Sequence, residues 1–158
     1  MEEALEYVER ALAERSALAR NVEGDLDVER GLAVAYEKVG NVLGDLGHFD
    51  QSIANFESSL EIRESLLEQH PESAQIQRDY AVAQYKLGLV HSVAAERPAI
   101  GPSDAAAQWE AAIEHFSIAL ASVRQSEALG TLQASDAHVP GMIEQHLEQC
   151  ETKLLALE

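Results

Sequence analysis

Six histidines and one cysteine are the residues of this chain whose types and spacing could bind a metal ion. His146 and Cys150 stand four residues apart, which on a helix places both side chains on one face, within reach of one ion. Cys150, however, falls on the apolar seam of its helix, and no second close pair of ligands is present to complete a tetrahedral site. The pattern therefore favours a buried structural thiol, and we expect no metal.

Catalytic signatures are absent from the sequence. It contains no Glu-x-x-His pair, no glycine-rich phosphate loop, no Gly-x-Ser-x-Gly elbow and no Ser/His/Asp order. These are the patterns that activate a water molecule or a hydroxyl group, or that hold a phosphate. We therefore expect a protein that is not an enzyme and that binds no cofactor.

The charge of the chain restricts its partners and its location. With 11 basic and 28 acidic residues, the net charge of −17 repels a nucleic-acid backbone and an anionic membrane surface, so we expect neither as a partner. The N-terminus is acidic where a secretory signal would be basic and then apolar, and no apolar run approaches the roughly 18 residues of a membrane span. A single cysteine cannot form an intrachain disulfide. We expect a cytoplasmic protein.

The residues from Gly40 to Pro71 predict a helical hairpin. A tight turn at residues 46–49 separates two helical runs, and Phe56 and Leu60 lie on one face of the second run. Gly40 stands about one turn before the tight turn, so the two helices can approach closely there. Pro71 fixes the end of the second helix, because the residue before a proline disfavours the helical conformation.

The hairpin is repeated along the chain. A shift of 48 residues places residues 30–47 over residues 78–95 with seven of 18 positions identical, where chance gives about one. The same shift places residues 4–18 over residues 52–66. The fifth predicted helix aligns with the third at a shift of 60 residues and not 48, so about 12 residues are inserted near residues 97–104.

These patterns predict an all-α protein of one domain with about six antiparallel helices. Aromatic residues are only 5% of the chain, and no period-two strand pattern is present. Adjacency pairs the first helix with the second, the third with the fourth and the fifth with the sixth. Ser103 is the expected N-cap of the fifth helix, and Pro140 suits the first turn of the last. The first four predicted helices span residues 2–21, 26–46, 50–69 and 73–95. The predicted repeat units are roughly 1–21 (partial), 25–71 and 72–127, followed by a C-terminal capping helix at 138–158.

A partner-binding groove is expected where the first helices of successive hairpins meet. In a stacked array these helices line one concave surface, and the residues beside their seams face it. The second helix contributes an acidic and polar half, whereas the fourth contributes an apolar half. The apolar half is explained either by an open groove, with Tyr85 as its anchor, or by a cover formed by the inserted loop or the last helix. The predicted groove residues are Val34, Glu37, Asn41 and Asp45 on the second helix and Val82, Tyr85, Leu89 and Val93 on the fourth.

The sequence resembles the tetratricopeptide repeat family over about residues 1–126. Gly40, Phe56 and the pattern Ala-x-x-x-Phe-x-x-Ala-Leu at residues 112–120 carry the resemblance. The long helix around residues 60–64 is similar to the extended variant of kinesin light chains, and residues 77–82 are similar to repeat arrays of bacterial signalling proteins. The resemblance implies a right-handed α-solenoid of stacked hairpins.

The family implies recognition of a peptide or protein in the concave groove, without catalysis. One version of the family clamps a C-terminal carboxylate with a Lys and, four residues later, an Asn; here Glu37 replaces that Lys, although Asn41 fits the Asn. This departure favours a ligand that is apolar, basic or both. The leading hypothesis is therefore a non-catalytic interaction scaffold. The alternative is a regulatory or oligomerisation segment of a larger bacterial signalling protein such as a kinase or NTPase, and a homo-oligomer is one possible assembly.

Overall fold

The computed structural model describes residues 2–22 and 24–157. The chain divides into two compact units, Met1–Pro71 and Glu72–Glu158, and each unit is described by itself. The boundary between them coincides with the predicted boundary between the repeat units 25–71 and 72–127. The expectation of a single domain stays a prediction.

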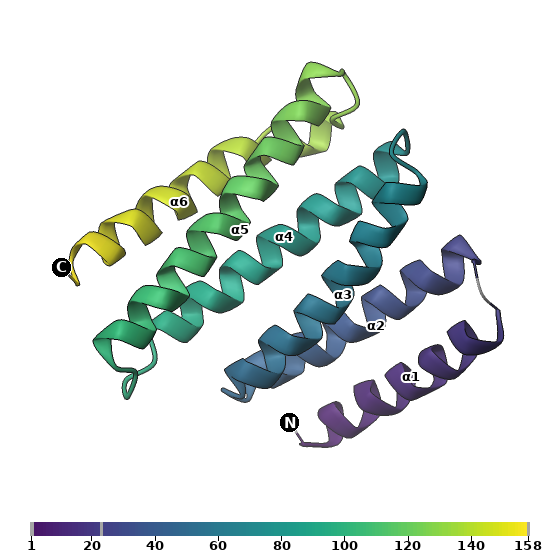
Figure 1. The fold of residues 1–158 in the computed structure, drawn as a ribbon, viewed down its shortest axis with the longest axis horizontal. Helices are drawn as coiled ribbons and strands as arrows, with labels where there is room; N and C mark the ends of the chain where they lie inside the picture. Colours follow the sequence, from purple (N-terminus) through teal and green to yellow (C-terminus); the bar gives the residue numbers. More distant parts are fainter. Residues whose placement is uncertain (1, 23, 158) are drawn as a thin grey trace. The chain divides into compact units, whose positions relative to one another are not determined.

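All regular structure in the described part of the chain is helical, which confirms the all-α prediction with six α-helices (Figure 1). Within the first unit α2 packs against both α1 and α3, and within the second α5 packs against both α4 and α6. The predicted pairs of the first two and of the last two helices are therefore present, while the pairing of the third with the fourth and the right-handed stacking stay predictions. The helices are α1 (Glu2–Asn21), α2 (Leu26–Asp45), α3 (Phe49–Gln69), α4 (Ala74–Ala95), α5 (Pro102–Ala128) and α6 (Val139–Leu155), with a short 3-10 helix η1 (Ala134–Asp136) before α6.

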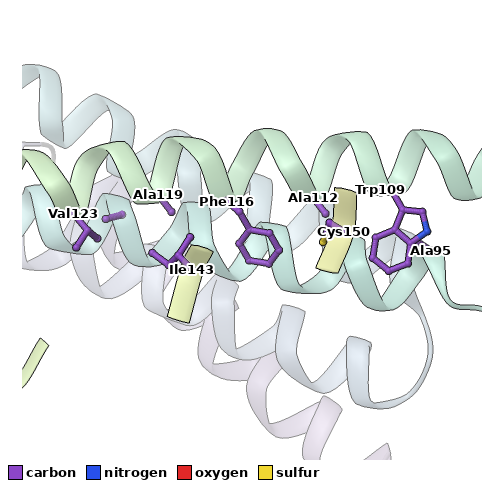
Figure 2. Packing of buried hydrophobic residues seen from close by; sticks show 9 residues of the cluster. Ala95, Trp109, Ala112, Phe116, Ala119, Val123, Ile143 and Cys150 are labelled. Carbon is purple, nitrogen blue, oxygen red and sulfur yellow. The ribbon is translucent and has the colours of Figure 1, made fainter. Parts of the chain in front are cut away.

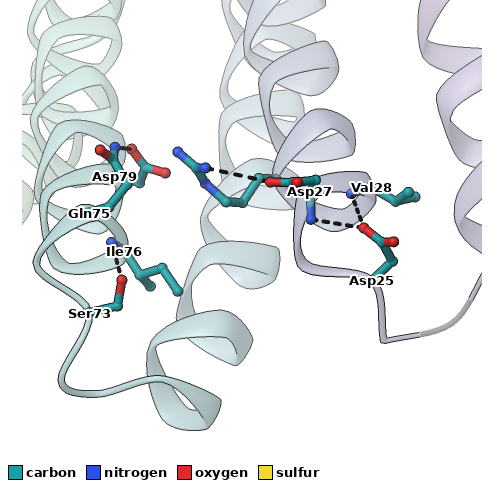
Figure 3. A network of polar contacts seen from close by, with 8 residues as sticks. Asp25, Asp27, Val28, Ser73, Gln75, Ile76 and Asp79 are labelled. Carbon is teal, nitrogen blue, oxygen red and sulfur yellow. Dashed lines mark hydrogen bonds and ion pairs between the residues drawn. The ribbon is translucent and has the colours of Figure 1, made fainter.

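Side-chain caps fix the starts of α2 and α4 (Figure 3). Asp25 Oδ1 accepts hydrogen bonds from the backbone N–H groups of Asp27 and Val28, both at 3.0 Å. Ser73 Oγ accepts one from the N–H of Ile76 at 3.4 Å. Each cap satisfies donors that have no partner inside the helix, typically for about 1 kcal/mol.

The predicted N-cap of α5 is wrong. The helix begins at Pro102 with Gly101 as its N-cap, so Ser103 lies inside the first turn and makes no capping hydrogen bond. The reason is that proline suits the first helical position, where its missing N–H has no intrahelical partner. The end of α5 is as expected, because Gly130 takes a φ of +70° that other residues rarely adopt.

The two hairpins repeat one close contact between a glycine and a phenylalanine. A methyl group built on Gly40 would lie 3.1 Å from the Phe56 ring, and one built on Gly88 would lie 2.6 Å from the Phe116 ring. In the first hairpin Ser52 Oγ also donates to the Gly40 carbonyl at 2.7 Å. These contacts confirm that the α2–α3 and α4–α5 hairpins correspond at shifts of 48 and 60 residues.

Replacing Gly88 by Ala is expected to destabilise the second unit by about 1–3 kcal/mol, because the added methyl group overlaps the rigid Phe116 ring. Gly141→Ala is the matched control, since Gly141 lies in α6 with no atom within 4 Å of an added methyl group. That change removes a flexible helix residue and should stabilise by about 0.5–1 kcal/mol. Urea denaturation measures both, and equal stabilities for the two variants would contradict the contact.

The core of the second unit is a cluster of buried side chains from α4, α5 and α6 (Figure 2). Phe116 is fully buried at its centre, and Trp109 of α5 and Cys150 of α6 lie toward one end. The apolar residues Ile113 and Leu120 of α5 and Leu147 and Leu154 of α6 pack against this core.

Helix α1 is the least buried helix. Its apolar residues Leu5, Val8 and Leu12 are only half-buried, and Leu18 is 41% exposed. Its main packing contact is with α2.

Candidate functional site

The predicted apolar residues of α4, which we call the α4 stripe (Val82, Tyr85, Leu89 and Val93), differ in exposure along the helix. Val82 and Val93 at the ends are 40% and 52% exposed, whereas Tyr85 and Leu89 in the middle are half-buried. The Tyr85 ring lies 5.6 Å from the rings of Phe116 and His146, measured between centroids. Helix α6 therefore covers the middle of the stripe, and both ends face outward.

A cavity of about 210 Å³, which we call the α4 pocket, opens beside Val82 and Tyr85. It lies between the first half of α4, the end of α5, the loop around η1 and the start of α6. Its interior is mainly apolar, with Val123, Leu132 and Ile143 among its lining residues. Burial raises the pKa of the Tyr85 phenol, so this group stays neutral at physiological pH.

One ion pair stands at the edge of the α4 pocket. Arg78 Nη2 lies 3.0 Å from Asp136 Oδ2, and both residues line the cavity. Because 44% of the Arg78 side chain is exposed, the pair contributes at most about 1 kcal/mol to stability. Its main effect is positional, since it joins the loop that carries η1 to helix α4.

The predicted groove residues of α2 differ in their exposure to solvent. Val34, Asn41 and Asp45 are exposed, but Glu37 is only 5% exposed. Its Oε1 atom lies 2.5 Å from Nη2 of Arg63 in α3, in an ion pair whose two side chains are each 7% exposed. The expectation that Glu37 is a solvent-exposed rim carboxylate is therefore wrong, because a buried arginine from the next helix neutralises it.

The α2 residues and the α4 stripe belong to different units. Their assembly into one groove stays a prediction.

The α4 pocket corresponds to the position of the buried ion pair in the first hairpin. Applying the shifts of 48 and 60 residues, Glu37 corresponds to Tyr85 and Arg63 corresponds to Val123. The first hairpin therefore fills this position with a salt bridge, and the second has two uncharged side chains beside a cavity. The sequence did not indicate Arg78, Val123 or Asp136 as site residues. Comparison of the repeats could have identified Val123, because it stands at the position of Arg63.

Comparison with known proteins agrees with this geometry. Residues 31–90 match the family model described as a tetratricopeptide repeat. This segment is of the tetratricopeptide-repeat type. No curated protein matches the sequence. The match confirms the expected family, while the resemblance to the extended kinesin-light-chain variant stays a prediction.

The matched tetratricopeptide segment runs from α2 through α3 into α4, and so includes Val34, Asn41 and three residues of the α4 stripe. Tetratricopeptide repeats generally mediate protein–protein interaction and act as scaffolds without catalysis. In the part of the chain that the structure describes, three or more potential ligands nowhere gather into a group that could hold a metal. Nor do the described residues include a helix of the length and apolarity that a membrane crossing requires.

The two candidate metal ligands of α6, His146 and Cys150, are both held by contacts within the folded protein. His146 Nδ1 donates to the Met142 carbonyl at 2.8 Å, and its ring packs against Tyr85 and Phe116. Cys150 is 2% exposed, and burial, with smaller contributions from Glu96 and Glu151, raises the pKa of its thiol to about 11. Both side chains therefore serve the packing of α6.

The Cys150 thiol is expected to react with iodoacetamide at pH 8 on the order of 100-fold more slowly than an unstructured cysteine peptide. A pKa of about 11 leaves roughly one thiol in a thousand ionised at this pH, and burial hinders access further. Mass spectrometry of timed samples measures the rate. The same protein in urea is the control and should be labelled at the rate of the peptide; equal rates for folded and unfolded protein would contradict the buried position.

A second polar cluster lies between α4 and α5. The His91 and His115 rings stack with centroids 5.4 Å apart, and the Nδ1 atom of each lies 2.7 Å from a glutamine Oε1 atom, of Gln108 and Gln84 respectively. Burial, followed by the proximity of His91, lowers the pKa of His115. The glutamines satisfy these side chains, which indicates a structural role in the hairpin.

Proposed function

We propose that the chain is a non-catalytic protein-interaction module that binds a peptide or protein segment in a groove to which the α4 stripe contributes. The observation that carries the proposal is the exposure of Val82 and Val93, two large apolar side chains on one helix. A stripe of this kind suits a partner that adds apolar contacts along the helix. The exposed residues Val34, Asn41 and Asp45 of α2, which belong to the other unit, stay predicted groove residues.

The partner is expected to combine apolar with basic residues. The net charge of −17 attracts a basic segment and raises its association rate at low salt. Among the predicted groove residues, Asp45 is an exposed carboxylate and Glu37 is already paired with Arg63. Apolar contacts would supply most of the affinity, because exposed charges mainly change rates and salt dependence.

Peptides selected from a random display library against the purified chain test this proposal. Val93→Asp should weaken the best peptides at least tenfold, because it places a charge in the apolar contact. Leu155→Asp is the matched control, since Leu155 is an apolar residue of α6 that is 67% exposed and outside the stripe. If both variants bind the peptides as the unaltered chain does, the α4 stripe is not the contact surface.

A regulatory or oligomerisation segment is the second candidate function. It is supported by α1, none of whose described residues is fully buried and whose Tyr7 is 68% exposed. Light scattering across a concentration series tests self-association. A strict monomer at the highest concentration would exclude the oligomerisation hypothesis.

A further inference from the structure

The α4 pocket lies where the second hairpin has no counterpart of the buried ion pair of the first. In the first hairpin Glu37 and Arg63 occupy the position with charged side chains that hydrogen-bond each other. At the corresponding position the second hairpin has Tyr85 and Val123, and the cavity lies against them. The position is therefore uncharged in the second hairpin, and the mainly apolar pocket beside it has its ion pair, Arg78 with Asp136, at the edge.

The size of the pocket limits its occupant to one side chain. Its volume is about 210 Å³. Small-molecule sites typically measure about 300–1,000 Å³, whereas an apolar cavity of about 150 Å³ already accepts benzene. The pocket therefore fits a single large aliphatic or aromatic side chain, with room for little else.

The lining of the pocket indicates an uncharged occupant. Val82, Val123 and Ile143 present apolar surface, and a charged group placed there would lose its water without gaining a partner. The one charged pair at the edge, Arg78 with Asp136, neutralises itself. A ligand charge would therefore lie outside the pocket.

The net charge of the second unit favours a basic peptide segment over a second copy of the chain as the source of this side chain. Residues 72–158 contain 12 acidic and 5 basic residues, a net charge of −7. A second copy of the chain would bring its own charge of −17 against this surface and be repelled. A segment with Lys or Arg beside its apolar residue would be attracted.

Resting on the proposed function, we propose that the α4 pocket binds one bulky uncharged side chain, such as Phe or Leu, from a peptide segment with basic flanking residues. The pocket gives the interaction module its sequence preference. The exposed ends of the α4 stripe add contacts that are less selective for shape.

Methionine methyl NMR tests this proposal directly. The chain contains two methionines, Met1 and Met142, and Met142 lines the pocket. With ¹³C-methyl methionine, the probe acetyl-Lys-Phe-Lys-amide should shift the Met142 signal through the aromatic ring current, with a dissociation constant in the roughly millimolar range expected for burying one side chain. Acetyl-Lys-Ala-Lys-amide should leave the signal unchanged. Acetyl-Glu-Phe-Glu-amide should bind at least several-fold more weakly, and binding equal to that of the lysine peptide would overturn the basic-flank part of the proposal.

A blocking variant provides the second measurement. Ala74 lines the pocket and is exposed at the start of α4, so Ala74→Phe should fill the opening without disturbing the core. It should weaken the acetyl-Lys-Phe-Lys-amide titration at least tenfold. Ala107→Phe, which adds the same ring at an exposed position of α5 outside the pocket, should not weaken it.

The outcomes separate this inference from the proposed function. If display-selected peptides bind in a manner sensitive to Val93→Asp but leave Met142 unshifted and tolerate Ala74→Phe, the stripe binds and the pocket inference is overturned. If Ala74→Phe abolishes binding and Ala107→Phe does not, the inference is supported. If no peptide responds to either Val93→Asp or Ala74→Phe, both proposals fail.

Discussion

Phe116→Ala is expected to lower the free energy of unfolding of the second unit by about 3–5 kcal/mol. Phe116 is fully buried, and its ring lies 5.6 Å from the Tyr85 ring and 5.4 Å from the His146 ring. It also fills the space that Gly88 leaves open on α4. Its removal would leave a cavity where α4, α5 and α6 meet, which backbone relaxation can only partly close. Urea denaturation measures the loss.

Phe116→Leu is the matched control for this prediction. It keeps an apolar side chain of similar bulk and should cost much less than the alanine change, about 1–1.5 kcal/mol. The difference in unfolding free energy between the two variants measures the cost of the cavity that alanine leaves. An unchanged thermal midpoint for Phe116→Ala would show that the ring does not anchor the hairpin.

The helices of the chain could be predicted closely because their signals are local. The capping residues Asp25 and Ser73, the turn glycine Gly47 and the breaker Pro71 stand in the sequence beside the boundaries that they determine. The start of α5 was missed because two local signals compete there. Ser103 is a good N-cap residue, but Pro102 before it fits the first helical turn better and moves the boundary.

The candidate site was predicted only in part because its geometry depends on distant residues. The period of α4 indicated an apolar stripe and left open a cover by the last helix, but it could not show that His146, more than 60 residues later, contacts Tyr85. The wall of the pocket likewise depends on Asp136 reaching Arg78. Local periodicity carries no information on these contacts, since they follow from the path of the chain after α5.

The burial of Glu37 in the first unit also depends on a residue that is distant in the sequence. Its spacing from Val34 and Asn41 suggested an exposed polar face, whereas the structure buries it. A carboxylate is buried only with a partner, and here that partner is Arg63, which is 26 residues away. The repeat contained a usable signal: Arg63 is a charged residue among the apolar positions of its helix, and it requires a buried acid nearby.

Glu37→Ala should therefore destabilise the first unit by about 3–5 kcal/mol, because it leaves the Arg63 guanidinium buried without its carboxylate. Glu144→Ala is the matched control. It removes the acid of the Arg124–Glu144 pair in the second unit, whose side chains are 59% and 46% exposed, and should cost less than about 1 kcal/mol. Urea denaturation of both variants in low and high salt measures the difference. Similar small losses would mean that Arg63 reaches water when Glu37 is absent.

The corresponding residues of the second hairpin allow a sharper form of this prediction. The double variant Glu37→Tyr with Arg63→Val copies the pair Tyr85 and Val123 into the first hairpin, and thereby removes both buried charges together. Because replacing a whole buried ion pair by apolar groups is often neutral, the double variant should recover most of the stability that Glu37→Ala loses. A double variant as unstable as Glu37→Ala would mean that the ion pair is required by the shape of the first hairpin.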